Sequence, residues 1–167
     1  MFTNRKPLNM KQLSSVILAM CIGAAATAQT MQPGFKDFDV ATGIASSSPK
    51  YLLSFGNKLY FYGSDGNIGR EPYVVSGAGT PVLIQNMNTL SAHSIGLNYI
   101  KPNAGMNGKY YFTGNDGGTG EELYMYDGTN APTLVHDLTV DGDSSMPDNY
   151  VVLNNKLYFT ADVDNFG

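Results

Sequence analysis

The residues best suited to do chemistry are two aspartates that recur in glycine-rich stretches. Asp65 and Asp116 each follow a lysine by seven residues, and both have Asn and Glu nearby. Clustered carboxylates and turn carbonyls are ligands that Ca²⁺ prefers, because it takes about six to eight oxygens. Asp and Asn beside Gly also build tight turns through side-chain to backbone hydrogen bonds. Turn formation is the favoured interpretation, and calcium binding is kept as the alternative.

A second acidic loop raises the same question nearer the end of the chain. It contains Asp141, Asp143 and Asp148, and the same two interpretations apply. The spacing in neither loop matches an EF-hand. The sequence therefore offers Asp65, Asp116, Asp141 and Asp143 as calcium candidates and no firm metal ligand.

Other catalytic patterns are missing from the sequence or weak. His93 and His136 are isolated, and the one cysteine, Cys21, lies near the start, so no zinc ligand set is present. There is no G-x-S-x-G motif. Glu71 and Glu122 could form a glycosidase-like pair, but a carboxylate that recurs in each repeat favours a structural role. We predict no catalytic residue and no cofactor.

These residues recur because the chain repeats itself. The copies align on Lys58, Lys109 and Lys156, which are 51 and 47 residues apart. At fixed offsets from these lysines stand Tyr60, Tyr111 and Tyr158; Phe61, Phe112 and Phe159; Gly69, Gly120 and Gly167; Glu71 and Glu122; Tyr73 and Tyr124; Leu83 and Leu134. A repeat of this length predicts a propeller, a solenoid or an array.

Each copy predicts short antiparallel strands joined by tight turns. The expected strands are 51–55, 58–62, 71–75 and 81–87 in copy one, 95–100, 109–113, 122–126 and 133–138 in copy two, and 150–153 and 156–160 in copy three. Alternation places Leu59 and Phe61 on one face, and Tyr60 and Tyr62 on the other. Pro72 predicts that its strand lies at a sheet edge or pairs irregularly, because proline has no N–H to donate.

Tyrosines are concentrated in the expected strands. They are Tyr60, Tyr62, Tyr73, Tyr111, Tyr124, Tyr126 and Tyr158. Aromatic faces can stack on sugars, or they can fill the gap between neighbouring units, where large rings bury much area. Packing between units is the favoured interpretation.

Residues 1–28 are predicted to be a secretory signal peptide. A basic start precedes the apolar run Val16–Ala26, and Ala26–Ala28 forms an A-x-A cleavage site. A lipoprotein signal ending at Cys21 is the alternative. The apolar run is too short for a transmembrane anchor, and no transmembrane segment is expected in the mature chain.

The mature chain is acidic. All 14 acidic residues but only seven of the ten basic ones follow residue 28, which gives a net charge of −7. This charge argues against binding to nucleic acid or to anionic membranes, where Lys and Arg neutralise phosphates. No cysteine remains to form a disulfide, so packing or a ligand must hold the fold.

One stretch resembles a known family. Residues 122–129 read ELYMYDGT and resemble the ELWxxDGT repeat family of secreted bacterial proteins, with Tyr124 in place of tryptophan. The flanking segments 108–113 and 134–138 are also similar to that pattern. Copy one departs from it, because Pro72 replaces leucine and Ser76–Gly77 replaces Asp-Gly. The resemblance implies a secreted or surface-displayed propeller-like protein with a C-terminal sorting domain, and no assigned chemistry.

The predicted architecture is all-β, with repeated four-stranded antiparallel units forming a partial β-propeller. The mature domain is 29–167, with units at about 50–88, 94–139 and an incomplete 144–167. We expect a longer protein with further repeats; an open β array is the alternative fold. The expected function is a non-catalytic binding or adhesion scaffold for an extracellular ligand or glycan, secreted or at the cell surface after cleavage near Ala28. The alternatives are a glycan-active enzyme with its site in other repeats, and a structural spacer.

The two interpretations of the acidic turns differ in their response to a chelator. We expect EDTA to leave the melting temperature of the mature protein unchanged, because a turn held by its own backbone needs no ion. Differential scanning calorimetry with and without EDTA measures this. A lower melting temperature in EDTA that Ca²⁺ restores and Mg²⁺ does not would assign a calcium site to these turns.

Overall fold

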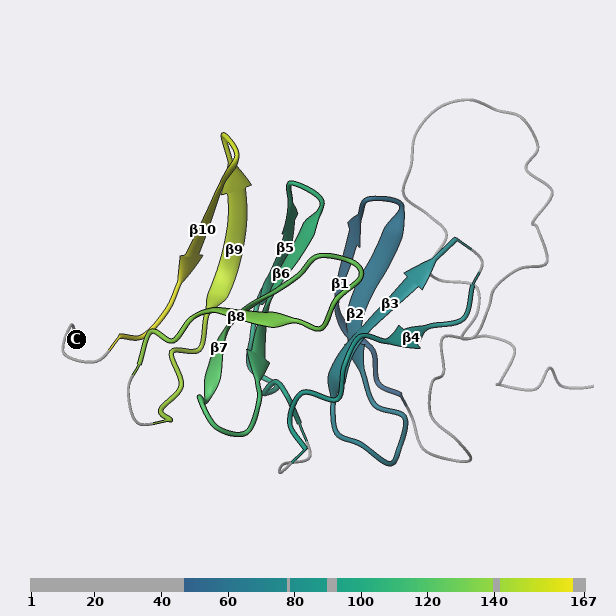
Figure 1. Ribbon diagram of the computed structural model, residues 1–167, viewed down its shortest axis with the longest axis horizontal. Helices are drawn as coiled ribbons and strands as arrows, with labels where there is room; N and C mark the ends of the chain where they lie inside the picture. The colour runs from purple at the N-terminus through teal and green to yellow at the C-terminus, as the bar shows by residue number, and fades with distance from the viewer. Residues whose placement is uncertain (1–46, 78, 90–92, 140–141, 164–167) are drawn as a thin grey trace, which may run out of the picture. The chain divides into compact units, whose positions relative to one another are not determined.

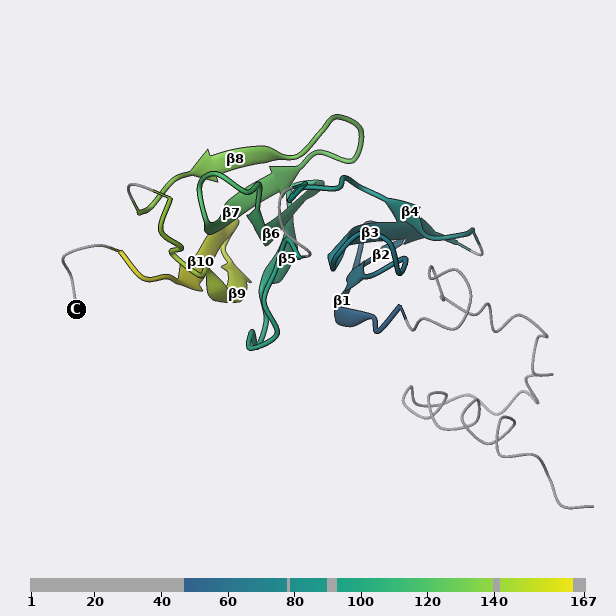
Figure 2. The same ribbon diagram turned by 90° about the horizontal axis from the view of Figure 1, so that it is seen from below.

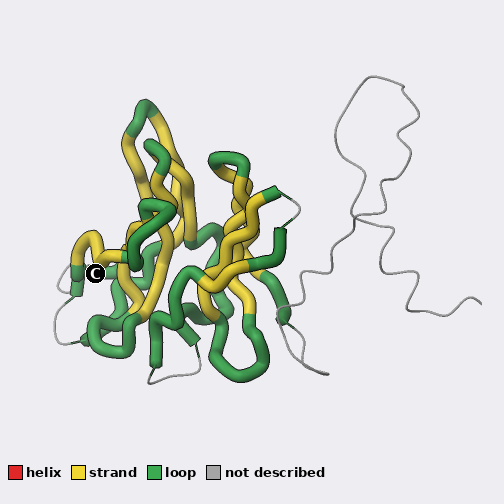
Figure 3. Tube along the Cα trace, turned by 45° about the vertical axis from the view of Figure 1, so that its right-hand side comes forward, coloured by secondary structure: helices red, strands yellow, loops and turns green. Residues whose placement is uncertain are grey.

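The computed structural model describes residues 47–77, 79–89, 93–139 and 142–163, in which ten strands form three antiparallel sheets (Figures 1 and 3). No described residue is helical. None of the described segments forms a helix long and apolar enough to cross a membrane. The predicted signal peptide and Asp141 lie outside the described residues. The all-β class and the four-stranded antiparallel units are confirmed.

The first sheet has the strand order β1-β2-β3-β4. Its strands are β1 Lys50–Phe55, β2 Lys58–Gly63, β3 Glu71–Ser76 and β4 Val82–Leu83. Gly56 and Asn57 join β1 to β2, with φ of 57° and 59°. Two consecutive positive φ angles are typical of a two-residue hairpin turn, and Gly and Asn adopt them at low cost.

The second sheet repeats this order as β5-β6-β7-β8. Its strands are β5 Asn103–Met106, β6 Lys109–Asn115, β7 Glu121–Tyr126 and β8 Thr133–His136. The turn Asn107–Gly108 again has two positive φ angles, 53° and 75°. The same turn chemistry therefore sets the register of both hairpins.

A two-stranded sheet follows the two four-stranded ones. It pairs β9, Asp148–Leu153, with β10, Lys156–Thr160. Its turn, Asn154–Asn155, has φ of 49° and 61°. The three hairpins β1–β2, β5–β6 and β9–β10 carry their turns on the same side, as Figure 1 shows. The strands predicted for copy three are confirmed.

The strand predicted at 95–100 is wrong. This segment contains no strand, and the first strand of the second sheet is β5, eight residues later. The hairpin turn explains the shift, because a two-residue turn at Asn107–Gly108 pairs Lys109 directly with Met106. Ile95 is instead fully buried in the connection that leads to β5.

Pro72 does not place its strand at a sheet edge. β3 lies between β2 and β4, and Pro72 is opposite Tyr62 in β2. The carbonyl of Pro72 accepts the N–H of Ile84 at 2.9 Å, so the side that lacks a donor faces β4. β4 spans only Val82–Leu83. The predicted strand 81–87 is therefore much shorter in the structure, and the irregular pairing falls where proline cannot donate.

Aromatic rings fill the space between the first two sheets. Tyr60 stacks on Tyr110 with ring centroids 4.3 Å apart, and Tyr62 meets Phe112 edge to face at 6.4 Å. The Tyr62 hydroxyl donates to the carbonyl of Thr113 at 2.5 Å. The faces predicted for β2 are confirmed, because Tyr60 and Tyr62 belong to this cluster while Phe61 stacks on Tyr73.

A second cluster joins the second sheet to the β9–β10 hairpin. Ala104, Leu123 and Tyr150 are buried there, and Tyr111 and Phe159 pack against them. Tyr60, Tyr62, Tyr111, Tyr124 and Tyr126 fill the gaps between units as predicted. Tyr73 belongs to neither cluster and stacks on Phe61 instead. Tyr158 is 51% exposed, because no described strand covers its face of β10.

Glycine is required where β1 meets β5. A Cβ atom at Gly105 would lie 2.1 Å from Cγ of Phe55 and 2.3 Å from Cδ2. Non-bonded carbon atoms do not approach so closely, so the ring of Phe55 occupies the space that a side chain at position 105 would need. The joint between the sheets depends on this contact, and Figure 2 shows β1 and β5 from below.

Gly105→Ala should destabilise the protein by about 1–3 kcal/mol, because the added methyl group overpacks the joint. Urea unfolding followed by circular dichroism measures the free energy of unfolding. The same substitution in a Phe55→Ala background is the matched control and should cost far less. An equal cost in both backgrounds would show that the Phe55 ring does not set the requirement for glycine.

Candidate functional site

The connections that leave each sheet are fixed by a buried glutamate. Glu122, at the start of β7, is fully buried. Its oxygens accept the N–H of Leu138 at 3.1 Å, the hydroxyl of Thr139 at 3.0 Å and the N–H of Ser145 at 2.8 Å. The Ser145 hydroxyl is 2.5 Å away. One carboxylate thus holds the beginning and the end of the connection from β8 to β9.

Glu71 occupies the equivalent position in β3 but has fewer partners. Its Oε2 accepts the N–H of Met87 at 3.0 Å, sixteen residues on, as Glu122 does with Leu138. Its Oε1 is buried and has no hydrogen-bond partner among the residues that the structure describes. Burial raises the pKa of Glu71 from 4.5 to about 7, partly offset by the Met87 hydrogen bond. A buried charge with an unsatisfied oxygen is costly, so this carboxyl favours its protonated form near neutral pH.

The sequence indicated the repetition of the two glutamates but not their partners. Ser94 and Ser145 both follow their glutamate by 23 residues, and this spacing was the missed signal. Ser94 donates its N–H and its hydroxyl to the carbonyl of Arg70, at 3.0 and 2.9 Å. The structural interpretation of Glu71 and Glu122 agrees with this arrangement, since both are enclosed.

The calcium candidates Asp65 and Asp116 each close a turn. Oδ1 of Asp65 accepts the N–H groups of Asn67 and Ile68, both at 2.8 Å. Oδ1 of Asp116 accepts those of Gly118 and Thr119, both at 2.9 Å. Bonds from Ile68 and Asn67 lower the pKa of Asp65. These are the hydrogen bonds that the turn interpretation describes.

Among the described residues, no group of three or more His, Cys, Asp or Glu is placed to hold a metal ion. Asp143 contributes its backbone carbonyl, 2.7 Å from the Thr139 hydroxyl. Nδ1 of His93 accepts the N–H of Arg70 at 2.9 Å, and His136 is exposed in β8. None of the described candidates therefore belongs to such a group.

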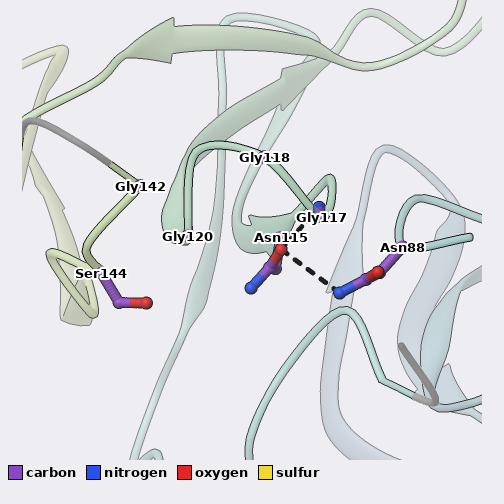
Figure 4. A pocket seen from close by; sticks show the side chains of 7 residues that line it. All are labelled: Asn88, Asn115, Gly117, Gly118, Gly120, Gly142 and Ser144. Atoms are coloured by element: carbon purple, nitrogen blue, oxygen red, sulfur yellow. Dashed lines mark hydrogen bonds between the residues drawn. The ribbon is translucent and has the colours of Figure 1, made fainter. Parts of the chain in front are cut away.

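A polar cavity lies where the β6–β7 turn meets the two connecting segments (Figure 4). Its volume is about 240 Å³, and its lining residues are Asn88, Asn115, Gly117, Gly118, Gly120, Gly142 and Ser144. Not one of them is charged. Oδ1 of Asn115 accepts the N–H of Gly117 at 2.7 Å and the side-chain amide of Asn88 at 3.3 Å.

Glycine permits the close approach that shapes this cavity. A Cβ at Gly120 would lie 2.2 Å from the carbonyl oxygen of Asp143, and φ of Gly120 is +78°. The two glutamates hold the walls, because Asn88 follows Met87 and Ser144 precedes Ser145. The Oγ atom of Ser144 in turn accepts the N–H of Glu121 at 2.9 Å. No sequence pattern marks Asn88, Asn115 or Ser144, since Asn and Ser are common in any loop.

One hydrogen-bond donor of the cavity has no partner within the described part of the chain. Nδ2 of Asn115 points away from Asn88, toward the side of Ser144, as Figure 4 shows. Oδ1 accepts both hydrogen bonds of this side chain to described residues, so the amide nitrogen remains to meet a ligand. An uncharged cavity with amide, hydroxyl and backbone groups is suited to a neutral polar ligand.

The two glutamates should respond differently to isosteric substitution. Between pH 4.5 and 7 the folded chain keeps a proton on Glu71 that the unfolded chain has released, so this contribution to stability falls as pH rises through that window. Glu71→Gln should remove this fall in stability, because the amide does not titrate. Above pH 7 the variant should therefore be more stable than the parent by up to about 3 kcal/mol.

Glu122→Gln is the matched control. An amide has one acceptor oxygen, so donors at Thr139 or Ser145 lose their partner, and we expect a loss of about 1–3 kcal/mol at every pH. Urea unfolding of the parent and both variants from pH 4.5 to 8 measures the differences. A constant difference between Glu71→Gln and the parent across this range would contradict the assignment to Glu71.

Comparison with known proteins gives no relative. The chain matches no family model, no curated protein and no solved structure.

Proposed function

We propose that this chain is an exported, non-catalytic repeat protein that binds an extracellular glycan. The observation that carries the proposal is the uncharged cavity lined by Asn88, Asn115 and Ser144. Its volume of about 240 Å³ is below the roughly 300–1,000 Å³ of clefts that bury a drug-sized molecule. One sugar ring, as the end or the branch of a glycan, is the unit that we match to it.

The donor and acceptor groups favour sugars over charged ligands. Sugar hydroxyls both donate and accept, and the cavity offers the free amide of Asn115 together with the hydroxyl of Ser144. No lining residue would neutralise a phosphate or a carboxylate. A neutral saccharide is therefore preferred to an acidic one.

The proposed architecture is a β-propeller of the kind that the ELWxxDGT resemblance implies. Support comes from the faces of the repeated sheets, since the Tyr60 face of the first packs on the Tyr110 face of the second. The Tyr111 face of the second meets the β9–β10 hairpin in the same order. Export rests on residues 1–28, with their basic start, apolar run and A-x-A site.

The binding proposal is tested on a glycan panel with the mature protein. We expect a neutral glycan to bind without release of sugar. Asn115→Asp should weaken that binding about fivefold to tenfold, because it keeps the acceptor for Gly117 but replaces the free donor by a charged oxygen. Asn154→Asp, in the β9–β10 turn, is the matched control and should bind normally.

Each other outcome changes the proposal in a defined way. Binding that Asn115→Asp leaves unaltered would place the glycan elsewhere on the chain. Release of reducing sugar would favour a glycan-active enzyme. A panel with no bound glycan would overturn the proposal and favour a structural spacer.

A further inference from the structure

A second cavity lies beside the polar one and has a different chemical character. Its volume is about 250 Å³, and its lining residues are Gly96, Leu97, Asn98, Tyr99, Glu121, Met146 and Asp148. They come from the connection between β4 and β5, the start of β7, the approach to β9 and the first residue of β9. Leu97 and Met146 are 55% and 52% exposed, so two large apolar side chains stand open to solvent at this cavity.

Two carboxylates in this cavity are held rigidly by neutral donors. Glu121 accepts the N–H of Gly96 at 2.6 Å on Oε1 and the hydroxyl of Tyr99 at 2.5 Å on Oε2. Asp148 accepts the N–H groups of Ile100 at 2.8 Å and Lys101 at 2.7 Å. A carboxylate has about four acceptor sites, so each keeps capacity for another donor.

The negative charge of the two carboxylates is not balanced within the cavity. The seven lining residues include no Lys, Arg or His. Burial, and after it the hydrogen bond to the Glu121 carboxylate, raise the pKa of Tyr99 far above its usual range, so its phenol stays neutral and adds no charge of its own. A cation is therefore the complementary partner for this site, and the apolar side chains select a cation with a hydrocarbon stem.

We propose that this cavity binds a lysine side chain of a basic peptide. The ammonium group would lie near Glu121 and Asp148, and its methylene stem would pack on Leu97 and Met146. Charge-assisted hydrogen bonds from an ammonium to carboxylates are stronger than neutral ones, and a partly enclosed site reduces screening by salt. The ring of Tyr99 offers an additional face to the cation.

The proposal separates this site from the glycan site chemically. The polar cavity has no charged lining residue, whereas this one has two acids and an apolar wall. The Glu121 side chain lines only the second cavity, and its one link to the polar cavity is its backbone N–H, which donates to Oγ of Ser144. Side-chain substitutions therefore address the two sites independently.

The test uses the mature protein and two small probes. The first is Nα-acetyl-lysine methylamide, and the second is Nα-acetyl-norleucine methylamide, which keeps the stem and lacks the ammonium. Titrations followed by ¹H–¹⁵N correlation spectra should show saturable shifts at Gly96 and Met146 with the lysine probe and at least about fivefold weaker binding of the norleucine probe. Binding of the lysine probe should weaken as salt is raised.

Variants assign the binding to the cavity. Glu121→Gln and Asp148→Asn should each weaken binding of the lysine probe about threefold to tenfold. Leu97→Ser should weaken the binding of both probes. Asp127→Asn, which removes the same charge in the turn after β7, is the matched control and should bind as the parent does. Because Glu121 also holds Gly96, the spectrum of each variant must retain the dispersed peaks of the parent, and Leu97→Ser serves if Glu121→Gln does not fold.

Three results would overturn the inference. They are equal binding of the two probes, no saturable shift with either, and unaltered lysine binding in both Asp148→Asn and Leu97→Ser. Asn115→Asp should leave the lysine probe unaffected. A failed lysine titration beside a bound glycan would therefore reject this inference and leave the proposed function standing.

Discussion

The arrangement of the loops depends on one kind of interaction, a buried carboxylate that ties a strand to the connection leaving its sheet. Glu122 accepts hydrogen bonds from residues 16, 17 and 23 positions further on, and so fixes a long irregular segment at both ends. Backbone N–H groups that leave a sheet need acceptors, and a carboxylate can supply several at once. Glu71 does the same work with fewer donors. The walls of the polar cavity follow from these two anchors.

Aromatic packing between sheets is the second constraint, and it acts with the first. The stacked pair Tyr60 and Tyr110 sets how closely two sheets approach, and Gly105 makes room for Phe55 beside it. Glu71 also places Met87 in the same aromatic cluster. The N–H of Met87 donates to Glu71, while the Met87 side chain is buried among the rings. Loop position and sheet packing are thus coupled through single residues. Neither cavity would keep its shape if the sheets were free to shift.

Much of the fold could be predicted from the sequence, because turn chemistry and alternation act locally. The pair Gly56–Asn57 and the alternation in Lys58–Tyr62 each specify a conformation without reference to distant residues. The segment 95–100 was misassigned because Ile95 is buried by the sheets it connects, which is a tertiary effect. The cavities could not be predicted for the same reason. Asn88, Asn115 and Ser144 are ordinary loop residues until the two glutamates bring their segments together.

The two faces of each sheet are chemically different, and this has a consequence for assembly. The face of β2 that carries Tyr60 packs on the opposite kind of face in the next sheet, the one that carries Tyr110. Such a head-to-tail contact is heterologous, so every unit offers a donor side and an acceptor side. Units joined in this way keep one polarity along the chain. A duplicated unit inserted between two others would pack one face on the unit before it and the other face on the unit after it. The length of such a protein can therefore change by whole repeats without new interface chemistry.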